Sequence, residues 1–288
     1  MSSEKPTQPT FASFYDFYDG PCAYRDRQSE MYRSLASESG GPVLELACGT
    51  GLITVALARA GFEVTGLDIA PDMLKVAREK IESEEPAVRT RIYLVEGDMK
   101  GFALDRTFGF IFIPSNSFCY LTEPGDRLSC LRAVTSHLPP GGLLAIEERN
   151  YTPELLMTML ARRGAHVISE AAINPLTGKY TTFGSVLRHI DFASQTIYER
   201  HLVDETQEDG TVKRYVRQPR SLAEGPRRWE TRHYFNRFEL ELLMEKAGFA
   251  VRHLWGSFDR QAFNSNSNSM IFVAEKVKEP DTLRPADA

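Results

Sequence analysis

Three acidic residues each follow a short apolar run in the first hundred residues. Glu45 comes just before the glycine-rich segment Leu46-Ala-Cys-Gly-Thr-Gly51, Asp68 lies 17 residues after Gly51, and Asp98 belongs to Glu96-Gly-Asp-Met99. Glycines in such a turn let the backbone pass close to a ligand that lies over the strand ends. A carboxylate beside the turn suits a ligand with an ammonium group and disfavours a pyrophosphate, because like charges repel.

The other two acids fit the rest of a nucleoside. At the end of a second strand, Asp68 can accept hydrogen bonds from both ribose hydroxyls. Asp98 can accept one from the adenine amino group, with Met99 packing on the ring. Each feature also has a plainer interpretation: a tight turn for the glycines, a helix cap for Asp68 and a turn residue for Asp98. The three acids together favour a cationic nucleoside ligand.

The segments around these residues alternate between two patterns. Short apolar runs at 42–47, 62–67, 91–95, 108–113 and 143–147 predict strands, and amphipathic runs at 51–60, 71–81 and 126–137 predict helices. This alternation is typical of a parallel sheet covered on both faces by helices. In an open sheet of this type, ligands bind outside the carboxyl ends of the strands.

The alternation stops at about residue 151. One helix is expected at 153–162, followed by polar and apolar alternation at 186–192 and 196–203. Asp209-Gly210 before the run 211–216 is a strong hairpin signal. Residues 151–235 are therefore predicted to form an inserted antiparallel cap. A helix at 237–247 and strands at 249–256 and 270–275 then complete the first domain, formed by 41–150 and 236–276.

Composition narrows the class of protein. The 288 residues are 42% hydrophobic and 25% charged, with a net charge of −5, which argues against a protein built mainly to bind nucleic acid. No apolar run approaches the roughly 20 residues of a membrane helix. The four cysteines show neither CxxC nor metal-ligand spacing, so we expect reduced thiols, no metal and a cytoplasmic location.

As a set, the motifs resemble those of the class I S-adenosylmethionine (SAM)-dependent methyltransferases. Glu45–Gly51 looks like the first motif of that family, Gly66–Leu74 like the second, Glu96–Met99 like the third, and Pro139–Leu144 like the turn into the fifth strand. The resemblance covers about residues 40–150 and 235–276. It implies an α/β Rossmann-like fold with a seven-stranded, mostly parallel sheet whose last strand is reversed, SAM as cofactor and S-adenosylhomocysteine as product.

Closer resemblance is to small-molecule members with a β-rich insertion, such as sugar amine N-methyltransferases and glycine N-methyltransferase. Their N-terminal tyrosine-rich segment closes over SAM, and residues 1–40 resemble it, although its tyrosines could equally anchor the first helix. By this analogy Arg27 would pair with the carboxylate of SAM. The cofactor-binding residues implied are Tyr15, Tyr24, Arg27, Glu45, Ala47, Gly49, Gly51, Asp68, Ile69, Met73, Asp98, Met99, Pro114 and Ser115.

The loop after the fourth strand is where the family places the acceptor. Here it reads Ile113-Pro-Ser-Asn-Ser-Phe-Cys-Tyr-Leu121 and does not match the N/D-PPY signature of methyltransferases that act on DNA bases or glutamine. The start of the strand also departs from the family, with Phe108-Gly-Phe110 where many members carry Asp. The candidates for acceptor binding are Asn116, Tyr120, Tyr234 and Arg260, and those for proton transfer are Tyr120, His189 and His233.

The insertion also carries a cluster of positive charge. Two acidic residues, Glu224 and Glu230, accompany eight basic ones between 213 and 237, namely Lys213, Arg214, Arg217, Arg220, Arg227, Arg228, Arg232 and Arg237. Three interpretations of this cluster stay open: a solvated face, a contact in a homodimer, or the mouth of a site for an anionic substrate.

The sequence therefore predicts methyl transfer from SAM to a small natural-product-like molecule. The expected acceptor atom is nitrogen or oxygen, with carbon as the second choice. Neither nucleic acid nor membrane is expected as a partner. Two alternatives stay open: a nicotinamide-dependent oxidoreductase, because a GxG turn and a following Asp also suit a dinucleotide, and a SAM-binding subunit without catalysis. Residues 277–288 are expected to be a disordered tail.

Overall fold

The computed structural model describes residues 11–18, 22–174, 177–216 and 229–278. Its first sheet has seven strands in the order β11-β12-β5-β4-β1-β2-β3. Their bounds are β1 Val43–Leu46, β2 Val64–Asp68, β3 Ile92–Glu96, β4 Phe110–Ile113, β5 Leu143–Arg149, β11 Phe249–Trp255 and β12 Ser269–Lys276. The helices around it are α1 Phe11–Tyr18, α2 Cys22–Ser39, α3 Leu52–Arg59, α4 Pro71–Glu82, α5 Pro86–Arg89, α6 Pro124–Ser136 and α8 Arg237–Lys246.

The strand pairing confirms the predicted α/β class. Strand β1 pairs in parallel with β2 and β4, and β4 pairs in parallel with β5. Strand β12 runs antiparallel to both β5 and β11, so it is the reversed last strand that the resemblance implied. The carboxyl ends of β1, β2, β4 and β5 therefore meet at one edge of the sheet.

Two apolar cores cover the faces of this sheet. Leu44, Ile111 and Ile146 pack with residues of α6 and α8 on one face, and Val43 and Phe110 pack with residues of α2 and α3 on the other. Every residue of β1 and β4 is buried, which explains why these strands, apart from Glu45, are apolar rather than alternating. The buried strands give the site residues at their ends a rigid support.

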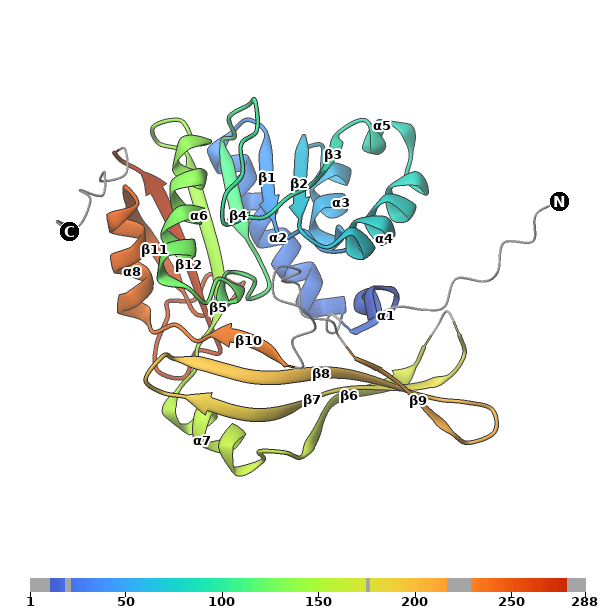
Figure 1. Cartoon of the computed structure of the whole chain (residues 1–288). Coiled ribbons are helices and arrows are strands. Elements are labelled where there is room, and N and C mark those ends of the chain that lie inside the picture. Colours follow the sequence, from blue (N-terminus) through green and yellow to red (C-terminus); the bar gives the residue numbers. More distant parts are fainter. Residues whose placement is uncertain (1–10, 19–21, 175–176, 217–228, 279–288) are drawn as a thin grey trace.

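The insertion forms a second, antiparallel sheet in the order β10-β8-β7-β6, with β9 paired to β8. In Figure 1 this sheet lies beneath the first one, at the end where β5 runs into α7. The bounds are α7 Pro153–Ala161, β6 His166–Ile173, β7 Tyr180–Asp191, β8 Thr196–Thr206, β9 Val212–Val216 and β10 Glu230–His233. The predicted Asp209-Gly210 hairpin joins β8 to β9, with Gln207 N donating to Thr211 O at 2.7 Å.

Some elements differ from the expectations. The fourth strand begins at Phe110 rather than at 108, since Gly109 crosses so close to Gly40 that a Cβ atom would lie 1.7 Å from the Gly40 carbonyl oxygen. Strands β6 and β10, helix α5 and the short 3-10 helix η1 (Phe118–Tyr120) were not predicted. The disorder predicted for 277–288 concerns, apart from Val277 and Lys278, positions outside the described residues. Within the described part of the chain, no helix is long and apolar enough to span a membrane.

Candidate active site

The glycine-rich turn after β1 is held by the acid at the end of β2. Gly49 N donates to Asp68 Oδ2 at 2.7 Å, and Ala70 N donates to Asp68 Oδ1 at 2.9 Å. Asp68 is fully buried. Gly49 has a φ of 55°, and a Cβ atom placed on it would meet nothing within 4 Å. The turn thus leaves open space beside a carboxylate whose two oxygens retain lone pairs for further donors.

Two other residues of the turn also adopt the left-handed conformation. Gly51 has a φ of 75°, and its Cα packs against α4 so closely that a Cβ would lie 3.3 Å from that of Ala77. Ala47 has a φ of 58°, a region where a Cβ is unfavourable. Such strain persists only where the surroundings impose it and is concentrated at ligand sites.

Glu45 is buried, and its side chain is engaged within the domain. Its carboxyl group accepts a hydrogen bond from the Thr54 hydroxyl on α3. Burial raises the pKa of Glu45 to about 8, against the lowering effect of the Thr54 bond. Dinucleotide-binding proteins normally carry Gly or Ala at the last conserved position of the motif GxGxxG. In this chain that position is Thr54, and its hydrogen bond to Glu45 accounts for the difference. A direct role for Glu45 toward an ammonium group stays a prediction.

The N-terminal helices lie over this turn. Lys80 Nζ on α4 donates to Thr50 O at 2.8 Å and pairs with Asp16 of α1 at 2.6 Å, and the Thr50 hydroxyl also donates to Asp16. Tyr15, beside Asp16, lines the cavity described below. The side chain of Tyr24 lies outside the described residues. Arg27 is half exposed and pairs with Asp259 at 3.2 Å, so the structure places it at a surface ion pair.

The remaining cofactor candidates lie along the same edge. Met73 and Pro114 are buried, and Ile69 and Met99 are half-buried. Asp98 accepts a hydrogen bond from Lys100 N at 3.0 Å and pairs with Lys100 Nζ at 3.5 Å. The structure thus shows Asp98 in a turn, and its contact with an adenine stays a prediction.

Ser115 and Asn116, directly after β4, form a second strained turn, with φ values of 55° and 57°. Two neighbouring carboxyl groups of β5 hold it. Glu147 Oε2 accepts from Ser115 N at 3.1 Å, and Glu148 Oε1 accepts from Cys119 N at 2.9 Å. Both carboxyl groups are buried, and burial raises the pKa of Glu148 to about 8.

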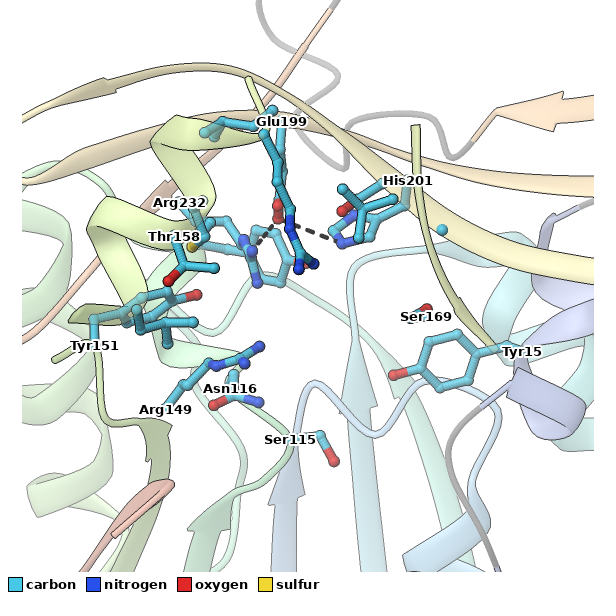
Figure 2. A pocket seen from close by; sticks show the side chains of 18 residues that line it. Tyr15, Ser115, Asn116, Arg149, Tyr151, Thr158, Ser169, Glu199, His201 and Arg232 are labelled. Carbon is cyan, nitrogen blue, oxygen red and sulfur yellow. Dashed lines mark ion pairs between the residues drawn. The ribbon is translucent and has the colours of Figure 1, made fainter. Parts of the chain in front are cut away.

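A cavity of about 420 Å³ opens between this turn and the second sheet. Figure 2 shows side chains reaching it from both domains, including Ser115, Asn116 and Arg149 from the first and Glu199 and His201 from the second. Tyr15 from α1 and Tyr151 after β5 also line it, and burial raises the pKa of Tyr151. The full lining comprises Tyr15, Ser115, Asn116, Tyr120, Arg149, Tyr151, Leu155, Thr158, Met159, Arg162, Val167, Ser169, Gly184, Ser185, Leu187, Glu199, His201 and Arg232.

A cluster of ionisable groups forms the wall supplied by the second sheet. His201 Nε2 lies 3.3 Å from Glu199 Oε1, and His201 Nδ1 lies 3.3 Å from Glu230 Oε1. Arg232 pairs with the same Glu199, as the dashed lines of Figure 2 indicate. Burial alone would lower the pKa of Arg232, but the carboxylate of Glu199 raises it well above its ordinary value. The cluster places one imidazole and one paired guanidinium at the cavity.

Among the predicted acceptor-side residues, Asn116 and Tyr120 line this cavity, and the other four do not. His189 is exposed on β7 and stacks on Tyr198 with ring centroids 6.1 Å apart. His233 is buried beside Glu239, with Nε2 to Oε1 at 2.8 Å. Tyr234 packs against Tyr151, and Arg260 pairs with Glu38 of α2 at 2.9 Å. Sequence reasoning missed His201, although it lies within the predicted strand 196–203, because nothing in that segment distinguishes it from the other histidines.

The basic cluster of 213–237 is divided in the structure. Arg217, Arg220, Arg227 and Arg228 lie outside the described residues. Arg214 pairs with Asp204 at 2.6 Å and Arg237 with Glu241 at 2.8 Å, both at the surface. Arg232 alone of the described members lines the cavity. No group of three or more His, Cys, Asp or Glu that could hold a metal ion occurs among the described residues.

Comparison with known proteins finds methyltransferases. Residues 43–142 match the methyltransferase domain family. A putative methyltransferase of Bacillus subtilis, YqeM, is 34% identical over 138 residues, which cover 48% of this chain and 53% of that protein. The chain thus spans about half the length of the curated relatives it matches.

Solved structures match over nearly the whole chain and confirm the fold. The CcbJ methyltransferase of Streptomyces caelestis aligns with a TM-score of 0.72 and 22% identity, over 93% of this chain and 97% of that one. SAM-bound CalS10, an amino pentose methyltransferase of Micromonospora echinaspora, aligns with a TM-score of 0.65 and 18% identity, over 95% and 99%. The predicted resemblance to small-molecule methyltransferases is confirmed, and these comparisons give no support to an oxidoreductase.

Proposed function

We propose that this protein is a SAM-dependent methyltransferase that acts on a small molecule in the cavity between its two sheets. The observation that carries the proposal is the pairing of the open glycine turn with buried Asp68, whose Oδ2 accepts from Gly49 N at 2.7 Å. The family match of residues 43–142 and the SAM-bound state of CalS10 support the same donor.

The residues present fit SAM. Each oxygen of Asp68 accepts one backbone hydrogen bond, so each can accept a ribose hydroxyl as well. Open space above Gly49 leaves room for the ligand against the backbone. When bound, SAM supplies a methyl group on a sulfonium, which is already activated for an in-line displacement.

The task left to the chain is to orient the acceptor and exclude water, because holding two reactants in line removes much of the entropic barrier. Ser115 and Asn116 at the end of β4 and Tyr15 from α1 are placed for this role, since all three line the cavity. We assign the acceptor-binding role to Asn116 and Tyr120.

Proton removal falls to His201 in this proposal. Its imidazole lies in the cavity wall and is oriented by Glu230 at Nδ1, which leaves Nε2 beside Glu199 and the cavity. A carboxylate that fixes the orientation of a histidine is the usual support of a general base. The cationic lining of Arg149, Arg162 and Arg232 favours an acceptor with negative charge. A cytoplasmic location and a homodimer through the insertion complete the proposal.

A transfer assay tests this function. Purified protein would be incubated with SAM carrying a labelled methyl group and with panels of small amines, hydroxyl compounds and enol-type carbon acceptors, each with and without a carboxylate or phosphate. We expect label in an acceptor of at least one panel. Folded protein that binds SAM but transfers label to no panel would instead favour the role of a non-catalytic SAM-binding subunit.

A further inference from the structure

The carboxyl group of Glu239 joins the second sheet to the first domain. Glu239 lies in the first turn of α8, where Asn236 caps its backbone nitrogen at 3.0 Å. Its Oε1 accepts from His233 Nε2 of β10 at 2.8 Å, and its Oε2 accepts from Gln195 Nε2, in the turn between β7 and β8, at 3.2 Å. One carboxyl group thus binds two separate elements of the inserted sheet.

Arg127 of α6 extends this connection toward the acceptor loop. Its Nη2 lies 3.9 Å from Glu239 Oε1, and its Nη1 donates to the carbonyl oxygens of Leu121 and Thr122, each at 3.2 Å. Arg127 is only 4% exposed. Burial lowers its pKa, while Glu239 raises it. A buried guanidinium needs a carboxylate nearby, because an unpaired buried charge is very costly.

Both ends of this connection reach the cavity. The loop that ends at Leu121 carries Asn116 and Tyr120, which line it. Strand β10, held at His233, carries Arg232 on its other face, and Arg232 lines the cavity too. Apolar contacts run alongside, since Phe118 of η1 stacks on Phe235 with ring centroids 5.4 Å apart. Glu239 itself lies outside the lining.

We propose that Glu239 is a positioning residue that fixes the inserted sheet against the acceptor loop through His233, Gln195 and Arg127. The proposal rests on the proposed function for its catalytic consequence but not for its structural one. Without the carboxylate, His233 and Gln195 lose a shared acceptor and Arg127 loses its counter-charge. The two walls of the cavity then lose this polar tie, and the orientation of a bound acceptor is relaxed.

Amide hydrogen exchange of the full chain tests the structural part. Wild type would be compared with Glu239→Ala, Glu239→Gln and the matched control Glu241→Ala, which removes only a surface pair with Arg237 on the same helix. In Glu239→Ala we expect faster exchange in residues 115–122 and 230–235, with 43–68 unchanged. Glu239→Gln retains an acceptor for His233 and should restore most of the protection. Unchanged exchange at 115–122, or equally faster exchange everywhere, would overturn the proposal.

Steady-state kinetics with an acceptor found in the transfer assay test the catalytic part. A displacement of about 1 Å at the reacting centre can cost on the order of 10²-fold in rate, so kcat of Glu239→Ala should fall at least tenfold. Its Kd for SAM should stay at the wild-type value, and Glu241→Ala should match wild type in both. A loss confined to SAM affinity would contradict a positioning role. If wild type itself transfers no methyl group, the proposed function fails. The exchange experiment still decides whether Glu239 fixes the inserted sheet against the acceptor loop.

Discussion

Glu147 Oε2 lies 3.1 Å from the backbone nitrogen of Ser115, the first of two residues that leave β4 in the left-handed conformation. The same oxygen accepts from Gln28 Nε2 at 2.8 Å and from the Tyr32 hydroxyl at 3.2 Å. A single buried carboxylate therefore ties helix α2 to the turn that carries the acceptor side of the site. The strain of that turn is maintained by a buried carboxyl oxygen that accepts from its backbone.

Removal of this carboxylate should loosen the turn. Glu147→Ala leaves three buried donors without their shared acceptor, so we expect the free energy of unfolding to fall by about 2–4 kcal/mol. Glu147→Gln keeps one carbonyl oxygen and should lose about 1 kcal/mol. Urea denaturation of both variants checks this. Equal stability of Glu147→Ala and wild type would show that the turn is held by other means.

Asp68 should control cofactor affinity. Hydrogen bonds to a charged group contribute about 1.5–3 kcal/mol each, so Asp68→Ala should weaken SAM binding on the order of 100-fold or more. Asp72→Ala is the control, because Asp72 is exposed in the first turn of α4, four residues further along. Isothermal titration calorimetry measures both. Similar losses in the two variants would point to a general electrostatic effect rather than a contact by Asp68.

Stability should depend on pH through Glu148. Burial raises its pKa to about 8 from an ordinary value of 4.5, so the folded chain binds the proton more tightly than the unfolded one. The contribution of Glu148 to stability is therefore fully present below pH 4.5 and is lost as the pH rises through about 8. Glu148→Gln should gain about 4 kcal/mol relative to wild type between pH 5 and pH 9. Parallel pH profiles in denaturant melts would contradict this assignment.

His201 should be required for transfer to an acceptor that must lose a proton. Replacing His201 with Asn should reduce kcat/KM for such an acceptor by about 10²- to 10⁴-fold. His189→Asn is the matched control, because His189 is exposed on the same sheet and lies outside the cavity lining. A wild-type kcat/KM in His201→Asn would assign proton removal to another group or to solvent.

Much of the first domain could be predicted because its signals are local. Apart from Glu45, β1 and β4 are apolar runs, and the glycine turn follows β1 directly, so the place of the turn could be inferred. Its hydrogen bond to Asp68 could not, because Asp68 was expected only as a ribose-binding residue or a helix cap. The cavity wall could not, because it depends on the packing of two sheets. Nothing local distinguishes His201, which faces the cavity, from His189, which faces solvent, and Glu147 and Glu148 look like ordinary residues at the end of a strand.

The ion pair of Arg27 was likewise not evident from the sequence. The resemblance implies that Arg27 pairs with the carboxylate of SAM, which stays a prediction, and the structure pairs it with Asp259, 232 positions further along the chain. Such a long-range partner leaves no signal in the local pattern. The left-handed φ of 58° at Ala47 was also not evident from the residue type, because glycine is the residue that favours this region.

Calorimetric titration of the wild-type protein tests the central claim most directly, with SAM in one experiment and NAD in another. The open turn beside buried Asp68 predicts saturable binding of SAM and S-adenosylhomocysteine at one site per chain, and no binding of NAD under the same conditions. Folded protein that binds neither SAM nor S-adenosylhomocysteine, or that binds NAD in their place, would contradict the account.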